Sequence, residues 1–165
     1  MKLAIDVYYH NTTAKAVGVL FDDWQAATPT QIISTDVDDV ADYEPGNFYK
    51  RELPCILKLL EQIDLTTLDV IVVDGYVHLN DDGKAGLGAH LFEALGGKIP
   101  VVGVAKTSFH NNTRNVVPVL RSSKNPLFVT AIGTALPAAA ASVQNMHGPF
   151  RMPTLLKVLD QETRR

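Results

Sequence analysis

The chain has 165 residues, of which 46% are apolar and 20% are charged, as in an ordinary globular protein. No apolar run reaches the ~18 residues that a membrane-spanning helix needs, and no charged-then-apolar leader opens the chain. We therefore expect a single domain over residues 1–165, located in the cytoplasm. The one cysteine, Cys55, excludes an intramolecular disulfide and a zinc site built from several cysteines.

The net charge of −3 combines two halves of opposite sign. Residues 1–97 hold 6 Lys and Arg against 16 Asp and Glu, and residues 98–165 hold 9 against 2. An acidic half that carries metal ligands, joined to a basic half that meets phosphates, would suit a metal-dependent nuclease. Two solvated charged faces would give the same pattern, so charge alone leaves both interpretations open.

Taken in chain order, the first part of the sequence predicts an antiparallel meander followed by a helix. Alternating β-forming residues, separated by polar breaks, indicate strands over 1–9, 14–20 and 30–35. Leucines and isoleucines at helical spacing then indicate a helix over about 47–63. Asn47 is the expected N-cap, and Pro54 is tolerated only near the first regular turn.

The remainder alternates strands and helices. Short apolar runs predict strands over 68–73, 100–105, 116–120 and 126–130. Helical spacing predicts helices over 83–95, 135–146 and 153–162. A meander followed by alternating helices and strands predicts an α/β fold, in which a mixed sheet combines the antiparallel meander with parallel strands and carries helices on both faces.

Three acidic residues occupy positions where a carboxylate is costly. Asp6 lies inside the first strand, Glu52 in the first long helix, and Asp74 at the end of the apolar run 70–73. Such a carboxylate must be paired, hydrogen-bonded or bound to a cation. Mg²⁺ and Mn²⁺ prefer oxygen ligands, so converging carboxylates predict a hard-metal site of the phosphodiesterase kind.

Seven short motifs, in their order and spacing, resemble those of the endonuclease V family. They are Ile5-Asp6-Val7-Tyr8-Tyr9, Tyr43-Glu44-Pro45-Gly46 with Phe48-Tyr49-Lys50-Arg51-Glu52, Asp69-Val70-Ile71-Val72-Val73-Asp74-Gly75, Gly86-Leu87-Gly88-Ala89-His90-Leu91, Pro100-Val101-Val102-Gly103-Val104-Ala105-Lys106, Pro126-Leu127-Phe128-Val129 and Gly148-Pro149-Phe150-Arg151-Met152-Pro153. Together they cover nearly the whole chain.

The resemblance implies a ribonuclease H-like fold and a Mg²⁺- or Mn²⁺-dependent endonuclease. Members of the family recognise deaminated bases, chiefly inosine, in DNA or RNA, and cut at the second phosphodiester on the 3′ side. By this resemblance Asp6, Glu52 and Asp74 are the catalytic, metal-binding carboxylates, and Lys106 is the catalytic lysine near the scissile phosphate. Tyr43 matches the aromatic wedge that holds the strands apart at the lesion.

Further residues are expected to bind the substrate. Gly75, Tyr76 and His78 form the loop after the last metal carboxylate, where the flipped base of the family would sit, and Tyr76 replaces a small family residue there. Arg114 is a candidate phosphate contact, as are Arg121 and Lys124. The late family histidine that assists at the metal has no counterpart in residues 130–137.

Two alternatives to an inosine-directed nuclease stay open. The chain could be a nuclease of the same fold that cuts flaps or unmodified RNA. It could also be a catalytically weakened homologue that binds nucleic acid or a protein partner, as the missing histidine would allow. Carboxylate-dependent Mn²⁺ uptake separates either nuclease from a binding module.

Overall fold

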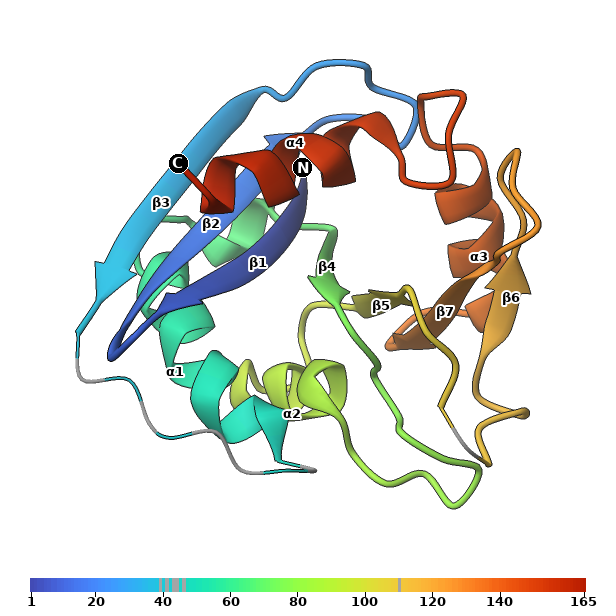
Figure 1. Ribbon diagram of the computed structural model, residues 1–165, viewed down its shortest axis with the longest axis horizontal. Helices are drawn as coiled ribbons and strands as arrows, with labels where there is room; N and C mark the ends of the chain where they lie inside the picture. The colour runs from blue at the N-terminus through green and yellow to red at the C-terminus, as the bar shows by residue number, and fades with distance from the viewer. Residues whose placement is uncertain (39, 41, 43–44, 46, 110) are drawn as a thin grey trace.

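The structure, a computed structural model, describes residues 1–165 except 39, 41, 43, 44, 46 and 110. The described residues form one seven-stranded sheet (Figure 1). Its strands are β1 (Lys2–His10), β2 (Thr13–Phe21), β3 (Gln31–Val37), β4 (Val70–Asp74), β5 (Val101–Ala105), β6 (Val117–Val119) and β7 (Leu127–Ile132). They lie in the order β3-β2-β1-β4-β5-β7-β6.

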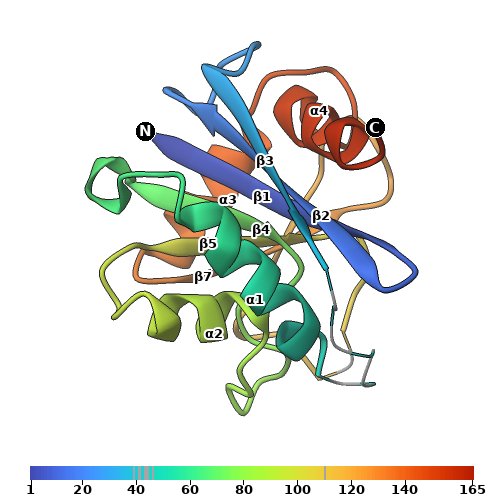
Figure 2. The same cartoon turned by 90° about the vertical axis from the view of Figure 1, so that its left-hand side faces the viewer.

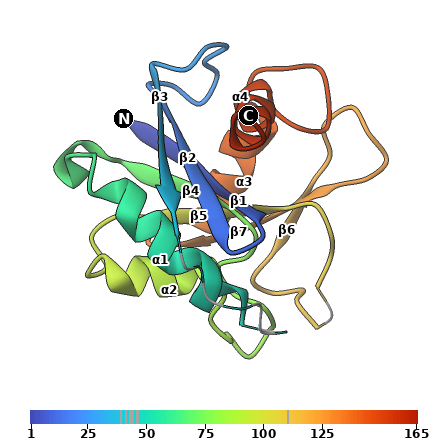
Figure 3. The ribbon, with the colours of Figure 1, turned by 60° about the vertical axis from the view of Figure 1, so that its left-hand side comes forward.

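Helices cover both faces of this sheet (Figures 2 and 3). They are α1 (Phe48–Leu60), α2 (Leu87–Ala94), α3 (Leu136–Gln144) and α4 (Thr154–Thr163), with a 3₁₀ turn η1 (Leu65–Thr67) before β4. The buried side chains divide into two clusters, one under α1 and α2 and the other under α3 and α4. The expected mixed sheet with helices on both faces is therefore confirmed.

The centre of the sheet is parallel and its flanks are antiparallel. β1 runs parallel to β4, and β4 runs parallel to β5, whereas β2, β3, β7 and β6 join by antiparallel pairs. The carboxyl ends of the three central strands consequently meet at one edge, where the loops that follow them gather. The predicted carboxylates of β1 and β4 both belong to this edge.

Side-chain alternation along β1 decides which face Asp6 shares. Leu3, Ile5 and Val7 pack into the cluster under α1 and α2, while Ala4 packs into the cluster under α3 and α4. Because successive strand residues point to opposite faces, Asp6 follows Ala4 and faces α4. The same alternation on β4 places Asp74 on that face.

Three helices are shorter than predicted, whereas α4 keeps the predicted length and is shifted by one residue. The helix expected over 83–95 starts at Leu87, because the preceding segment forms an irregular loop closed by a bridge between His78 and Ala85. Asn47 stands at the N-cap position of α1, but its side chain makes no capping hydrogen bond. Pro54 lies inside α1, six residues after Phe48 and so beyond the first turn, and it is exposed.

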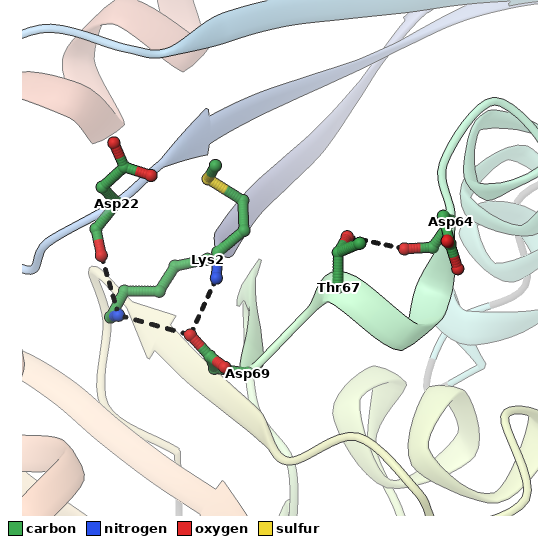
Figure 4. Close-up of polar contacts among 6 residues, drawn as sticks. Lys2, Asp22, Asp64, Thr67 and Asp69 are labelled. Atoms are coloured by element: carbon green, nitrogen blue, oxygen red, sulfur yellow. Dashed lines mark hydrogen bonds and ion pairs between the residues drawn. The ribbon is translucent and has the colours of Figure 1, made fainter.

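The opposite end of the sheet is tied by a polar network (Figure 4). The amino group of Met1 lies 2.8 Å from the Asp69 carboxylate, and the Lys2 ammonium lies 3.7 Å from it. The same ammonium donates to the carbonyl of Asp22 over 3.1 Å. These contacts hold the start of β1 beside the start of β4. They thereby help to set the register between the two strands that carry Asp6 and Asp74 to the other end.

Among the described residues, no helix has the length and apolar character needed to cross a membrane.

Candidate active site at the ends of the central strands

The registers of the central strands bring the predicted catalytic residues of β1, β4 and β5 together. Ile5 pairs with Val73, so the next residues, Asp6 and Asp74, lie side by side at the end of the ladder. Asp74 in turn pairs with Val104, and Lys106 follows Val104 on the same face. These three side chains line one small cavity.

The cavity lies beneath α4 and has a volume of about 30 Å³. Asp160 of α4 joins Asp6, Asp74 and Lys106 in its polar wall, and Met152, Leu156 and Leu159 supply an apolar wall. That volume suffices for about one water molecule or one small ion. We refer to this space as the carboxylate cavity.

Burial and the closeness of other carboxylates raise the pKa values of the carboxyl groups at the cavity. Burial, together with the nearby charge of Asp74, raises the pKa of Asp6 from 3.8 to about 7. The Val7 amide, which donates a 2.8 Å hydrogen bond to Asp6, opposes this rise. Partial burial also raises the pKa of Asp74, where the Lys106 ammonium opposes the rise and Asp160 adds to it. Removing charge from this cavity is thus favourable.

Glu52 approaches the same strand ends from the other face of the sheet, on α1. Burial, followed by the charges of Asp6 and Asp74, raises its pKa from 4.5 to about 8. The neighbouring Arg51 opposes that rise, and its guanidinium lies 3.6 Å from the centroid of the Tyr9 ring. Glu52 therefore interacts electrostatically with both strand carboxylates, although it does not line the carboxylate cavity.

A second hollow, larger than the first, opens on the α1 and α2 side of the strand ends. Its volume is about 320 Å³, and we call it the base cleft for its size and lining. Asp74 and Lys106 line this cleft as well as the carboxylate cavity. The remaining lining residues are Glu52, Gly75, Tyr76, Leu79, Leu87, Ala105, Thr107 and Phe109. A flat apolar group held in this cleft would lie directly beside the carboxylates.

Tyr76 forms a wall of the base cleft. Its hydroxyl donates a 2.6 Å hydrogen bond to the carbonyl of Thr107, and its ring meets Phe109 edge to face with centroids 5.8 Å apart. Tyr76 is only 7% exposed, whereas Phe109 is 42% exposed. Gly75, with φ of 128°, makes the turn between Asp74 and this wall.

The other predicted substrate-binding residues lie elsewhere. His78 is half-buried behind Tyr76, its carbonyl accepting a hydrogen bond from Asn112, and it lines neither hollow. Arg114 is exposed, and its backbone amide donates to Asp81. Tyr43 lies outside the described residues.

Within the part of the chain that the structure describes, no three His, Cys, Asp or Glu side chains are grouped so as to hold a metal ion. The carboxylates surround the strand ends as separate groups that repel one another. Their donor chemistry nevertheless fits a hard divalent cation, because all the ligands are oxygen atoms and the repulsion would be relieved by positive charge. Their role as metal ligands stays a prediction.

Sequence reasoning missed Asp160. Asp160 and Glu162 are the two acidic residues of residues 98–165, the basic half of the chain. A carboxylate in an otherwise basic region was the sequence feature that could have pointed to Asp160. Asp160 lies one helical turn after Leu156, so both reach the carboxylate cavity. Arg164 lies 3.5 Å from the Asp160 carboxylate in a partly exposed ion pair.

Arg121, expected as a phosphate contact, is instead a buried structural residue that is 6% exposed. Its guanidinium donates to four backbone carbonyls, one at the end of α3 and three in the segment that joins α3 to α4, those of Gln144, Met146, Gly148 and Arg151. The expectation was wrong because these carbonyls use up the donors that a phosphate would need.

Comparison with known proteins agrees with this geometry. Human ENDOV has a TM-score of 0.76 at 23% identity, covering 99% of this chain and 82% of the human one. Endonuclease V of Ciona intestinalis, solved with a 24-mer DNA that contains an inosine followed by a ribo-adenosine, has a TM-score of 0.80 at 19% identity and covers 99% and 84%. Endonuclease V of Bacillus subtilis has a TM-score of 0.75 at 18% identity, and the match covers 99% of this chain and 78% of the Bacillus one.

These likenesses show the ribonuclease H-like fold that the resemblance implied. A search of curated proteins gives no match. The model of the endonuclease V family, by contrast, matches residues 3–157. This range includes Asp6, Glu52, Asp74, Lys106 and all the residues that line the base cleft, but not Asp160. The chain therefore belongs to the endonuclease V family of nucleases.

Proposed function

We propose that this protein is a Mg²⁺- or Mn²⁺-dependent endonuclease that hydrolyses a phosphodiester beside a deaminated base such as inosine. The observation that carries the proposal is the pair of adjoining hollows, which share Asp74 and Lys106. One hollow concentrates carboxylates, and the other has the size and apolar lining for a base. The complex of the Ciona intestinalis relative with inosine-containing DNA supports the same substrate class.

In this proposal Asp6 and Asp74 hold the principal metal ion, and Glu52 completes a second site. Asp160 adds a fourth carboxylate, in a chain that lacks the late family histidine. The bound cation would activate a water molecule and stabilise the leaving oxygen. No nucleophilic side chain is needed, in keeping with the buried and inert Cys55.

The chain's own residues position the substrate. The Lys106 ammonium lies where it can neutralise a phosphate held between the two hollows, and so offset the charge that builds up in the transition state. An extruded base would rest against Tyr76 and Phe109, which would compensate for its lost stacking. Gly75 keeps this wall next to Asp74. Tyr43, as the wedge, and Arg114 and His78, as outlying contacts, complete the proposed substrate-binding set.

The proposal also treats residues 1–165 as one catalytic domain. The continuous sheet from β3 to β6 supports this, as does the return of α4 onto β1 and β2, where the Lys15 ammonium donates to the carbonyl of Arg165. The expected partner is a strand of DNA or RNA.

The test is cleavage of single strands that carry one inosine, in Mg²⁺ or Mn²⁺, against the same strands with adenosine or guanosine at that position. Asp74→Asn is the matched control, since it removes the charge and keeps the volume. Wild-type cleavage at the inosine, lost in Asp74→Asn, is the expected result. Equal cleavage by both proteins would contradict the assigned centre.

A second candidate is a nuclease of the same fold that takes a different base or structure. Tyr76 favours it, because its ring narrows the base cleft at a position where the family has a small residue. Faster cleavage of undamaged or flapped strands than of inosine strands would establish this candidate in place of the first.

A further inference from the structure

A third hollow adjoins the carboxylate cavity, with which it shares Lys106, Met152, Leu156 and Asp160, whereas it shares only Lys106 with the base cleft. It has a volume of about 290 Å³ and lies at the start of α4. Lys106 lines it, as it lines the other two hollows, and Asp160 lines both it and the carboxylate cavity. The three hollows therefore form a continuous path that passes Lys106. We call the third one the Phe150 hollow.

The side chains at the mouth of the Phe150 hollow carry positive charge around one exposed ring. Phe150 is 65% exposed, the largest exposure among the large apolar side chains described. The Lys157 ammonium lies 5.7 Å from the centroid of its ring, within the range of a cation–π contact. An aromatic face beside an ammonium group matches the combination by which proteins bind single-stranded nucleic acid.

Hydrogen bonds hold the backbone of the segment that carries Phe150. Arg121 donates to three carbonyls of this segment, those of Met146, Gly148 and Arg151. The amide of Thr154 donates to the carbonyl of His147 over 2.8 Å. Gly148 has φ of 120° and packs so closely on Thr154 that a Cβ would lie 2.6 Å from its hydroxyl oxygen. A backbone that is already ordered loses little conformational entropy when a ligand stacks on the ring that it carries.

Arg151 links the same segment to the catalytic strand ends. Its guanidinium donates to the carbonyl of Lys106 and, over 2.8 Å, to the carbonyl of Pro126. The backbone of Lys106 is thus tied directly to the residue that follows Phe150. A nucleotide on the ring and a phosphate at Lys106 would be held at a fixed separation.

Resting on the proposed function, we propose that Phe150 and Lys157 form a stacking platform for an unpaired nucleotide of the substrate, on the side of the cleaved bond opposite the base cleft. The ring stacks on the base, and the Lys157 ammonium contacts the adjoining phosphate. The strand then enters at the base cleft, passes the carboxylates at Lys106 and leaves over Phe150. This assigns single-stranded nucleic acid, flanking the lesion, to a surface that the carboxylate chemistry does not use.

The chain offers a matched control at the other end of α4. Tyr8 is 41% exposed, and the Arg164 guanidinium lies 5.6 Å from the centroid of its ring. Tyr8 lines a separate hollow with His10, Lys15 and Arg165 that shares no residue with the three hollows of the path. Tyr8→Ala therefore removes an equivalent ring and cation contact away from the proposed path.

The experiment measures dissociation constants for fluorescein-labelled single strands with one inosine, in EDTA so that no cleavage occurs, and kcat and KM in Mn²⁺. Phe150→Ala should weaken binding roughly tenfold, as expected for the loss of one base–aromatic stack, and should raise KM with little change in kcat. Phe150→Tyr should restore wild-type values, and Tyr8→Ala should match wild type. The wild type and Phe150→Ala should bind equally to strands that are shortened on the side of the inosine that reaches Phe150. Shortening the strand on the other side should leave the difference in affinity between the two proteins unchanged.

Unchanged binding by Phe150→Ala would overturn the platform while leaving the proposed nuclease intact, provided that the wild type cleaves. An equal loss in Tyr8→Ala would also overturn it, since the ring effect would then not be local. Binding that depends on Phe150 without any cleavage would support the platform and reject the endonuclease. A wild type that binds no strand rejects both.

Discussion

The hydroxyl of Tyr76 donates a 2.6 Å hydrogen bond to the carbonyl of Thr107, which joins the loop after β4 to the loop after β5 across the base cleft. Tyr76→Phe removes this bond and keeps the ring. We expect a loss of about 0.5–1.5 kcal/mol in the free energy of unfolding, the usual contribution of one such bond. Because the hydroxyl no longer ties the ring to the loop after β5, the cleft wall is held less firmly, and KM for inosine strands should rise more than kcat falls. Denaturant unfolding and steady-state kinetics measure the two effects, and an unchanged KM would show that the hydroxyl is not needed to position the cleft wall.

The raised pKa values of Asp6 and Glu52, about 7 and about 8, predict the pH dependence of stability in the absence of metal. Between the ordinary values of 3.8 and 4.5 and these raised values, the folded state binds protons that the unfolded state has lost. The stabilising contribution of protonation is therefore full at low pH and is lost as pH rises through about 7 to 8. In EDTA, Tm should therefore fall as pH rises from about 4 to about 8, between the ordinary and the raised pKa values.

Asp6→Asn is the control for this fall in Tm, because the amide cannot titrate and the fall should become smaller. Mn²⁺ should raise Tm more at about pH 8.5 than at about pH 5, since metal ligands must be deprotonated. A Mn²⁺ effect of equal size at both pH values, or one that Asp6→Asn leaves unchanged, would argue against metal binding by these carboxylates.

Much of the site was predictable because it depends on strand ends. Asp6 and Asp74 interrupt or end apolar runs, and parallel central strands must bring their carboxyl ends to one edge. Lys106 follows from the same alternation two residues beyond Val104. Asp160 was not predictable, since which side of α4 meets the cavity depends on how that helix docks on β1 and β2. The burial of Arg121 depends on carbonyls supplied by a segment more than 20 residues away, which no local pattern records.

Asp160→Asn tests whether the helix carboxylate takes part in the reaction. In Mn²⁺ we expect kcat to fall by roughly 10- to 100-fold, the scale seen when groups that support a metal site are removed. Thermal stability in EDTA should stay the same or rise, because the change removes a negative charge that raises the pKa of both Asp6 and Asp74. Glu162→Gln, on the same helix, is the control and should keep wild-type kcat.

Gly103→Ala should disturb the strand ends from inside the sheet. A Cβ at this position would lie 2.5 Å from the carbonyl oxygen of Gly75 and 2.6 Å from the Thr130 hydroxyl oxygen. The Thr130 hydroxyl cannot move away easily, because it accepts a 2.8 Å hydrogen bond from the buried amide of Val77. We expect about 1–3 kcal/mol of destabilisation from overpacking and a fall in kcat as Asp74 shifts. Retention of wild-type stability and kcat would show that the turn adapts.

Arg114→Ala tests the remaining predicted phosphate contact. The side chain is exposed, so the free energy of unfolding should change by less than about 0.5 kcal/mol. If the residue meets a phosphate, the slope of log affinity against log salt should become shallower by about 0.7 for a single strand. Lys124→Ala serves for comparison, and an unchanged slope in Arg114→Ala would remove Arg114 from the interface.

The docking of α4 on the first two strands has a consequence for biosynthesis. Contacts such as that between Lys15 and Arg165 join residues 150 positions apart, and closing such long loops is a late event in folding. While the last helix is still inside the ribosomal tunnel, a nascent chain can pair its early strands, but the wall that bears Asp160 is missing and Leu155 and Leu159 have not yet covered the sheet. In the proposed nuclease, hydrolytic competence would thus arise only after α4 has left the tunnel and docked on β1 and β2.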